Sequence, residues 1–378
     1  MTPTQWLVDP SIAYLNHGGF GALPREVAGA AQELRRELEG NPTDLLMRQW
    51  QPRLDAVRER VAGLLRSSTD DLVFVPNATA GTATVIASLG LGAGDEVVTT
   101  DHRYPAVASQ LGAQAARDGF SVVERQVPVD ATAAEIVDLV MGGVSGRTRL
   151  LALDHIASPT GLFFPVRELV AAAHAAGVPV LVDAAHAPGQ VDVDLPSLDA
   201  DFWVGNLHKW VCSPRACAVL SVAPAWQDRI RPLVASHGYL EGYQPSFDWT
   251  GTTDPIPLLA IPAALDFWEG LGWDEVRRTQ HALATDGAQH VADVLGTRVA
   301  GRDELTAAMR LTELPRPLSA EEGVVLAGRL TTERRVTAHI THHGGASYVR
   351  VCGQLYNTPE HYERLGLALV ALLRRPSS

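Results

Sequence analysis

The chain has 378 residues, of which 46% are hydrophobic, and a formal net charge of -12 at pH 7. This length is sufficient for two packed domains. The negative charge and the scattered basic residues disfavour nucleic acid or an anionic membrane as a partner, so a small-molecule partner is favoured. No apolar run is long enough to cross a bilayer, and we expect a cytoplasmic protein. Three cysteines that match no zinc-binding spacing predict buried or partly buried thiols and no metal site.

A helical region is expected over residues 24–65, with a break at Asn41-Pro42. Seven short apolar runs then alternate with Ala-rich stretches of helical periodicity, such as 80–89 and 166–176. The strands are expected at 72–76, 96–100, 120–127, 149–155, 178–184, 201–205 and 216–222. This alternation predicts an α/β fold with a mostly parallel seven-stranded sheet covered by helices on both faces.

The pattern changes after about residue 225 to a stretch rich in Pro and Gly, followed by helices, an isolated strand in SYVRVCGQL and a terminal helix. We predict a smaller α+β domain here, completed by part of the N-terminus. The expected parts are an N-terminal active-site arm at 1–25, a large domain at 26–260 and a small domain at 261–378.

The most informative segment is DFWVGNLHKW, in which Lys209 follows a strand and is preceded by Asn206 and His208. A partly apolar strand end lowers the cost of losing the lysine proton, so Lys209 is suited to forming a Schiff base while its neighbours hold an anion. A lysine after a histidine is also common on protein surfaces, so this segment needs further support.

A second segment, VLVDAAHAPGQ, places Asp183 at the end of an apolar strand. A buried carboxylate needs a cationic partner, and a protonated pyridine nitrogen is one. His186, three residues later, would reach the hydroxyl of the same ring or stack near it. The alternative is that Asp183 caps the following turn.

Two further strand ends carry polar groups. In VPNATAGTAT, the backbone at Ala78 and the hydroxyl of Thr79 begin a helix and predict a phosphate cradle, although an ordinary helix cap accounts for the same residues. In TTDHRYPAV, His102 or Tyr104 is expected to lie on an aromatic ring. We favour His102, and an exposed loop histidine is the alternative.

The order of these strand ends is phosphate cradle, stacking residue, carboxylate and lysine. It resembles the fold-type-I pyridoxal-phosphate (PLP) enzymes of the class V aminotransferase group, and in particular the isopenicillin N epimerase-like branch. The resemblance covers nearly the whole chain, from YLNHGGFGALPREV through DHIASPTG, VDAAHAPG, GNLHKW and WTGTTDP to YVRVCGQLYNT. The segments around VDAAHAPG, the lysine and WTGTTDP are the most specific.

The resemblance implies that Lys209 holds PLP as a Schiff base and that Asp183 pairs with the pyridine nitrogen. It implies that the substrate carboxylate binds Arg350, for which a surface arginine on an edge strand is the alternative. The residues implied to hold the phosphate are Ala78, Thr79, Asn206 and His208, together with Thr252 and Thr253 of the neighbouring subunit of a homodimer. Ser158 departs from the asparagine of many class V enzymes, so Thr160 or His155 would take over its contact with the ring oxygen.

Lys209 is the expected base at the substrate Cα. We predict a lyase that acts on a cysteine-like S-conjugate in secondary metabolism. An epimerase, with His17 or Tyr14 as proton donor on the opposite face, is the alternative, followed by a decarboxylating or transaminating enzyme and by a PLP-binding protein without activity. A nicotinamide enzyme is disfavoured, because no G-x-G-x-x-G follows the first strand. The residues expected to meet the substrate side group are Asn16, His17, Phe20, Arg215 and His342.

Overall fold

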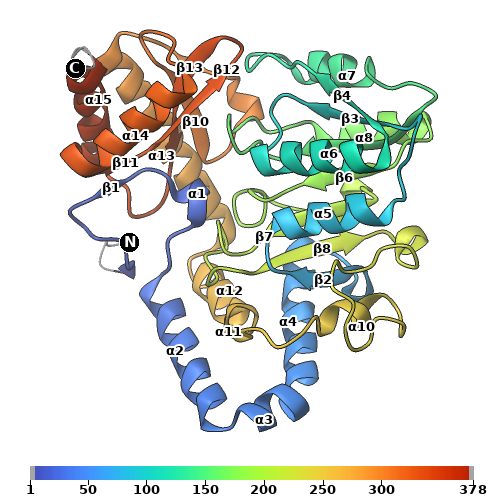
Figure 1. The fold of residues 1–378 in the computed structure, drawn as a ribbon. Helices are drawn as coiled ribbons and strands as arrows, with labels where there is room; N and C mark the ends of the chain where they lie inside the picture. The colour runs from blue at the N-terminus through green and yellow to red at the C-terminus, as the bar shows by residue number, and fades with distance from the viewer. Residues whose placement is uncertain (1–4, 374–378) are drawn as a thin grey trace.

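The computed structural model describes residues 5–373. A seven-stranded sheet with the order β2-β8-β7-β6-β5-β3-β4 forms the centre of the larger part (Figure 1). Its strands are β2 (Leu72–Val75), β3 (Glu96–Thr100), β4 (Ser121–Arg125), β5 (Thr148–Asp154), β6 (Val180–Asp183), β7 (Phe202–Asn206) and β8 (Ala218–Val222). All run parallel except β8, which is antiparallel to both of its neighbours. The predicted α/β fold is therefore confirmed, and every expected strand of the sheet is present.

Both faces of this sheet are buried, because successive strand residues enter two separate hydrophobic clusters. Leu181 packs with the cluster on the face of α5 and α6, while Val182 packs with the cluster that includes residues of α7 and α8. The helices of this part are α5 (Ala78–Ser88), α6 (Pro105–Asp118), α7 (Ala133–Met141), α8 (Val166–Ala175), α9 (Leu195–Leu198) and α10 (Tyr243–Asp248). Burial on both sides is the physical reason why these strands are continuous apolar runs in the sequence.

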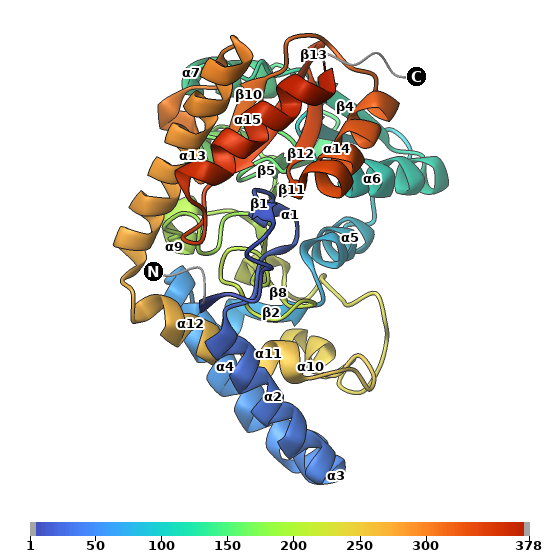
Figure 2. The ribbon, with the colours of Figure 1, turned by 90° about the vertical axis from the view of Figure 1, so that its left-hand side faces the viewer.

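A helical hairpin projects from the sheet at the bottom of both ribbon views (Figures 1 and 2). It consists of α2 (Arg25–Gly40), α3 (Pro42–Asp44), a π-helical turn (Leu45–Gln49) and α4 (Trp50–Leu65). The expected break at Asn41-Pro42 is confirmed, and the Asn41 side chain caps α3 by accepting from the Asp44 N–H. Two later helices, α11 (Ile256–Leu259) and α12 (Ile261–Glu269), pack against α2 and α4.

The smaller part contains a four-stranded antiparallel sheet with the order β12-β13-β10-β9. Its elements are β9 (Val299–Ala300), β10 (Met309–Glu313), β12 (His339–His343), β13 (Ala346–Cys352), α13 (Trp273–Leu295), α14 (Ala320–Arg334) and α15 (Pro359–Leu373). The prediction of an isolated strand was wrong, because β13 lies between β12 and β10. The polar sequences HITHH and MRLTE of these two strands carry no continuous apolar run.

The N-terminal segment crosses between the two parts. Strand β1 (Ala13–Tyr14) pairs in parallel with β11 (Val336–Thr337), and the short α1 (His17–Phe20) follows directly.

The predicted domain limits 1–25, 26–260 and 261–378 stay a prediction, and residues 1–4 and 374–378 lie outside the described part of the chain. Among the helices of residues 5–373, none combines the length and the apolar character needed to span a bilayer. Short 3-10 turns lie at Thr69–Asp71, Pro224–Trp226 and Asp303–Leu305.

Candidate active site

Lys209 lies in the loop that follows β7, and it is the only lysine in the 378 residues. This count is itself a signal in the sequence, because a Schiff base with a lysine side chain can form only at Lys209. The side chain is almost fully buried, and burial lowers its pKa to about 8, while the charge of Asp183 acts in the opposite direction. The chain therefore has a single side-chain amine, held where it gives up its proton readily.

The hydrogen bonds around Lys209 define its protonation. Its Nζ lies 3.0 Å from His186 Nε2, and the other ring nitrogen, Nδ1, lies 3.3 Å from Trp210 Nε1. An indole N–H can only donate, so Nδ1 accepts and the hydrogen of the neutral ring is on Nε2. Lys209 Nζ then accepts from His186, which is the arrangement of the neutral amine, and the lowered pKa of Lys209 brings this form within reach near neutral pH. Burial lowers the pKa of His186 well below its usual value, so the ring stays neutral.

Asp183, at the end of β6, is buried and accepts the Ala185 N–H at 3.0 Å. No ion pair within residues 5–373 involves this carboxylate, and burial raises its pKa, opposed by the Ala185 hydrogen bond and by Lys209. Asp154 of β5 lies beside it in register, and both residues line one narrow cavity. Burial and then the charge of Asp183 raise the pKa of Asp154 well above its usual value. Asp154 was not predicted, because only the pairing of β5 with β6 brings the two carboxyl groups together.

The predicted phosphate residues gather at the start of α5. The Ala78 N–H donates to Asn206 Oδ1 at 2.8 Å, which joins this helix to the end of β7. Asn77 caps the helix by accepting the Ala80 N–H at 2.9 Å, so the capping interpretation also holds. His208 contacts the Cys217 carbonyl through Nδ1 at 2.9 Å, and burial lowers its pKa to about 4. Thr79 follows Ala78 in the first turn of the helix.

Tyr104, rather than His102, lines the cavity beside Asp183. His102 is fully buried, with Nδ1 2.7 Å from Thr160 Oγ1 and Nε2 2.7 Å from the Val127 carbonyl. Both ring nitrogens of His102 are therefore engaged, and so is the Thr160 hydroxyl. The geometry reverses our preference: Tyr104 is the better placed candidate for stacking on a ring held by Asp183.

His155 and Ser158 lie in the segment after β5. Nδ1 of the buried His155 accepts from Trp203 Nε1 at 3.3 Å, and burial lowers the pKa of His155 to about 4. The Ser158 carbonyl accepts from the guanidinium of Arg350. This segment thus contacts both the large sheet and the small sheet.

Arg350 lies on β13, is 2% exposed, and donates from Nη2 to Asn16 Oδ1 at 2.8 Å. The alternative of a surface arginine on an edge strand does not hold, because β13 is an inner strand of its sheet. Within the described residues Arg350 Nε has no hydrogen-bond partner. Asn16 and Arg350 were both predicted, and the structure brings them into direct contact.

The N-terminal segment covers the Lys209 loop. His17 donates from Nε2 to the Lys209 carbonyl at 3.1 Å and accepts at Nδ1 from the Tyr356 hydroxyl at 3.0 Å. Gly21 has a φ of +69°, and a Cβ there would lie 2.2 Å from the His208 carbonyl oxygen. Since both nitrogens of the buried His17 ring are engaged, the expectation that His17 donates a proton to a substrate conflicts with the structure.

Three predicted substrate residues lie at the margin of the site or away from it. Phe20 is 66% exposed, and Arg215 donates to the Gly21 carbonyl at 3.1 Å. His342 is exposed and packs near Gly323 of α14, whereas its strand neighbour His339 pairs with Arg350 in register. Because side chains alternate along a strand, His342 points to the face opposite Arg350, so its assignment was wrong.

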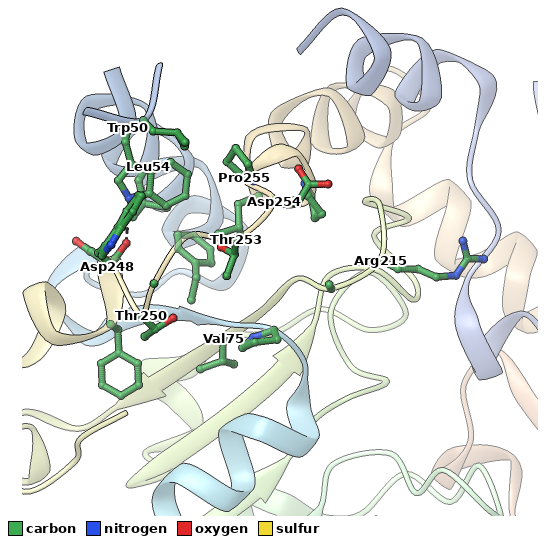
Figure 3. A pocket seen from close by; sticks show the side chains of 18 residues that line it. Trp50, Leu54, Val75, Arg215, Asp248, Thr250, Thr253, Asp254 and Pro255 are labelled. Carbon is green, nitrogen blue, oxygen red and sulfur yellow. Dashed lines mark hydrogen bonds between the residues drawn. The ribbon is translucent and has the colours of Figure 1, made fainter. Parts of the chain in front are cut away.

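A separate cavity of about 320 Å³ lies between α4, the end of β2 and the loop after α10. Figure 3 shows Thr253, Asp254 and Pro255 on this loop, opposite the side chains of Trp50 and Leu54. Thr253 lines the cavity, and both Thr252 and Thr253 are exposed. Neither threonine has a hydrogen bond that ties it to Lys209 of the same chain.

The expectation for the cysteines is confirmed. Cys212, Cys217 and Cys352 are free and buried. Burial raises the pKa of Cys212 well above its usual value, so the thiol beside Lys209 stays protonated and is a poor nucleophile.

Known proteins resemble this chain over most of its length. The model of the family "Aminotransferase class-V" matches residues 13–315. Isopenicillin N epimerase of Streptomyces clavuligerus is 31% identical over 97% of this chain and 96% of its own. L-cysteine desulfhydrase of Arabidopsis thaliana is 30% identical over 96% of this chain and 88% of its own. The structure of the cystine C-S lyase C-DES with its product cysteine persulfide has a TM-score of 0.82 at 22% identity, covering 95% and 97% of the two chains.

Proposed function

Because the chain belongs to the aminotransferase class V family of PLP-dependent enzymes, we propose that it removes the Cα proton of a cysteine-like amino acid and expels the sulfur substituent. The observation that carries the proposal is the buried amine of Lys209, which lies beside His186 Nε2 and whose pKa is lowered by burial. L-cysteine desulfhydrase and isopenicillin N epimerase are both relatives of at least 30% identity, so the family includes lyases and an epimerase.

The residues present fit the cofactor. Asp183 is a buried carboxylate without an ion-pair partner in residues 5–373, which suits a pyridinium nitrogen. We assign the phosphate to the N-terminus of α5, at Ala78 and Thr79, with Asn206 and His208, and ring stacking to Tyr104. When bound, PLP supplies an electron sink that stabilises negative charge at Cα.

Lys209 Nζ would hold the proton that leaves Cα. In the proposed elimination the Cα–H and Cβ–S bonds break, the proton passes to Nζ, and the substituent departs as a thiolate that receives a proton. After hydrolysis the remaining carbon skeleton is released as pyruvate and the amino group as ammonia. Arg350 and Asn16 would hold the substrate carboxylate, with the free Arg350 Nε and the two Nη groups as donors.

A homodimer with shared sites is part of the proposal. Thr252 and Thr253 are exposed and would complete the phosphate site of the neighbouring subunit. The segment before α10 also exposes Leu233, Val234 and Leu240, the last at 93%. Exposed apolar side chains grouped in this way are typical of protein interfaces. We propose the cytoplasm as the location, which fractionation of the producing cells tests.

The first experiment reduces the purified protein with borohydride and maps the modified peptide by mass spectrometry. Lys209 is the only side-chain amine, so the expected result is one pyridoxyl group on the Lys209 peptide and none in Lys209→Ala. A protein that carries no such group after loading with PLP contradicts the assignment.

The second experiment separates the reactions. Free and S-substituted cysteines are incubated in heavy water, and pyruvate release and deuterium at Cα are measured together. Pyruvate and thiol in equal amounts are expected. Deuterium exchange with inversion and no pyruvate would instead establish epimerisation, the second candidate, which the 31% identity to isopenicillin N epimerase favours. For that reaction Tyr14 is the remaining candidate donor, because the His17 ring is engaged.

A further inference from the structure

Two histidines, a carboxylate and a backbone carbonyl converge where the large and small sheets meet. His102 Nε2 and His343 Nε2 lie 2.7 Å and 2.9 Å from the Val127 carbonyl oxygen. Asp101 Oδ2 lies 3.6 Å from His343 Nε2, and Asp101 Oδ1 lies 3.9 Å from His102 Nε2. The side-chain ligand atoms are all within 4.8 Å of one another.

These separations match those around a single ion. With metal–ligand distances of about 2.0–2.2 Å, ligand atoms in a tetrahedral site are roughly 3.3–3.6 Å apart. The measured distances bracket this range. In the structure both Nε2–H groups donate to the Val127 carbonyl and the Val127 N–H donates to Asp101 Oδ1 at 3.0 Å, so a bound ion would take the place of the two Nε2 protons. Two imidazoles and a carboxylate are a ligand set that zinc and similar divalent metals prefer over calcium or magnesium.

The surroundings also resemble those of a metal site. Thr160 Oγ1 lies 2.7 Å from His102 Nδ1, so the hydroxyl fixes this ring with Nε2 toward the cluster. Such a partner on the second ring nitrogen is the usual support of a metal-bound histidine. Asp101 contributes a negative charge that no lysine or arginine contacts among the described ion pairs. A divalent cation would offset that charge.

We propose that Asp101, His102, His343 and the Val127 carbonyl bind one divalent transition-metal ion of the zinc class. The ion would join the small sheet, through His343 of β12, to the loop that also carries Tyr104. The site is distinct from the Lys209 site, and the inference does not depend on the proposed function.

The test uses the chelator-treated, purified full-length enzyme and Co²⁺ as a coloured substitute for Zn²⁺. We expect one Co²⁺ per chain with visible absorption bands of nitrogen and oxygen coordination, and displacement of Co²⁺ by Zn²⁺. In His343→Gln and Asp101→Asn the affinity should fall by about 100-fold or more. His342→Gln is the matched control, because the neighbouring His342 points to the other face of β12, and it should bind as the unaltered protein does.

Lys209→Ala separates this site from the cofactor, because it retains all four ligand groups and should bind Co²⁺ unchanged. Thermal unfolding with and without Zn²⁺ provides a second measurement, and Zn²⁺ should raise the Tm of the unaltered protein but not that of His343→Gln. Circular dichroism establishes whether each variant is folded. If His343→Gln does not fold, Asp101→Asn provides the test of metal binding. Equal Co²⁺ affinity in the unaltered protein, His343→Gln and Asp101→Asn, or no stoichiometric binding, overturns the proposal.

Discussion

Lys209 and Arg350 belong to different sheets and are held in different ways. Around Lys209, His186 and Trp210 form a continuous set of hydrogen bonds, and every polar group in it has a defined role as donor or acceptor. Around Arg350 the contacts come from the N-terminal segment and from the loop after β5, and Nε keeps no partner within residues 5–373. The hydrogen bonds of the Lys209 amine thus come from loops of the large sheet, whereas the contacts of Arg350 depend on how distant segments meet.

The largest effect is expected on the cofactor side, in Asp183→Asn. Removing one member of a buried charge pair costs about 3–5 kcal/mol, so PLP affinity should fall about 150- to 5,000-fold. Equilibrium dialysis of the cofactor measures this change. Asp199→Asn, at an 85% exposed side chain, is the control and should bind PLP normally. Normal PLP affinity in Asp183→Asn would show that this carboxylate does not pair with the pyridine nitrogen.

Arg350→Lys tests the substrate side. A lysine cannot make the two parallel hydrogen bonds of a guanidinium, so KM should rise about 10- to 100-fold with a smaller change in kcat. Steady-state kinetics on the best cysteine conjugate provide the measurement, and Arg316→Lys at an exposed position is the control. An unchanged KM would mean that the substrate carboxylate binds elsewhere.

Gly21→Ala tests whether the N-terminal segment must lie against the Lys209 loop. A Cβ would lie 2.2 Å from the His208 carbonyl oxygen at a φ of +69°, so we expect a loss of about 1–3 kcal/mol in the free energy of unfolding. Gly344→Ala separates the two causes, because Gly344 has a φ of +56° but open space around it. Urea unfolding of both variants measures the difference, and equal losses would argue against the close contact at Gly21.

The buried histidines predict a loss of stability in acid. Burial lowers the pKa of His17 from 6.5 to about 3. Between these values the unfolded chain binds the proton and the folded chain does not, so stability is lost as the pH falls below about 6.5. Between pH 7.5 and pH 5.5, the free energy of unfolding should fall by about 1 kcal/mol less in His17→Gln than in the unaltered protein. Urea unfolding at both pH values measures the change, with His237→Gln at an exposed loop position as the control variant. The same pH dependence in His17→Gln as in the unaltered protein would contradict the prediction.

The smallest effect distinguishes Tyr104 from His102. Tyr104→Phe keeps the aromatic ring and should change PLP affinity by less than about threefold, whereas Tyr104→Ala should weaken it by about tenfold. Cofactor fluorescence titration measures both. If instead His102→Gln weakens PLP binding and Tyr104→Ala does not, the pyridine ring of PLP stacks on His102, as the sequence analysis predicted.

The large sheet was predictable because parallel strands buried on both faces are continuous apolar runs, and the polar groups at their ends stand out. The small sheet was not, since HITHH of β12 has neither an apolar run nor a clear alternation. The same strand explains the error at His342. Adjacent histidines on a strand point to opposite faces, and the sequence does not state which face meets Arg350.

The amino-acid sequence by itself determined the order of groups along the chain, and it places the one lysine of the molecule directly after β7. It did not determine which groups touch. The pairing of Asp154 with Asp183, the engagement of both His17 nitrogens and the position of Tyr104 in the cavity follow from strand register and from contacts between distant segments. The spacing of apolar residues along the chain determines which segments form helices and strands. The directions in which side chains point across a site depend on packing between elements that are distant in sequence, so only the tertiary structure shows them.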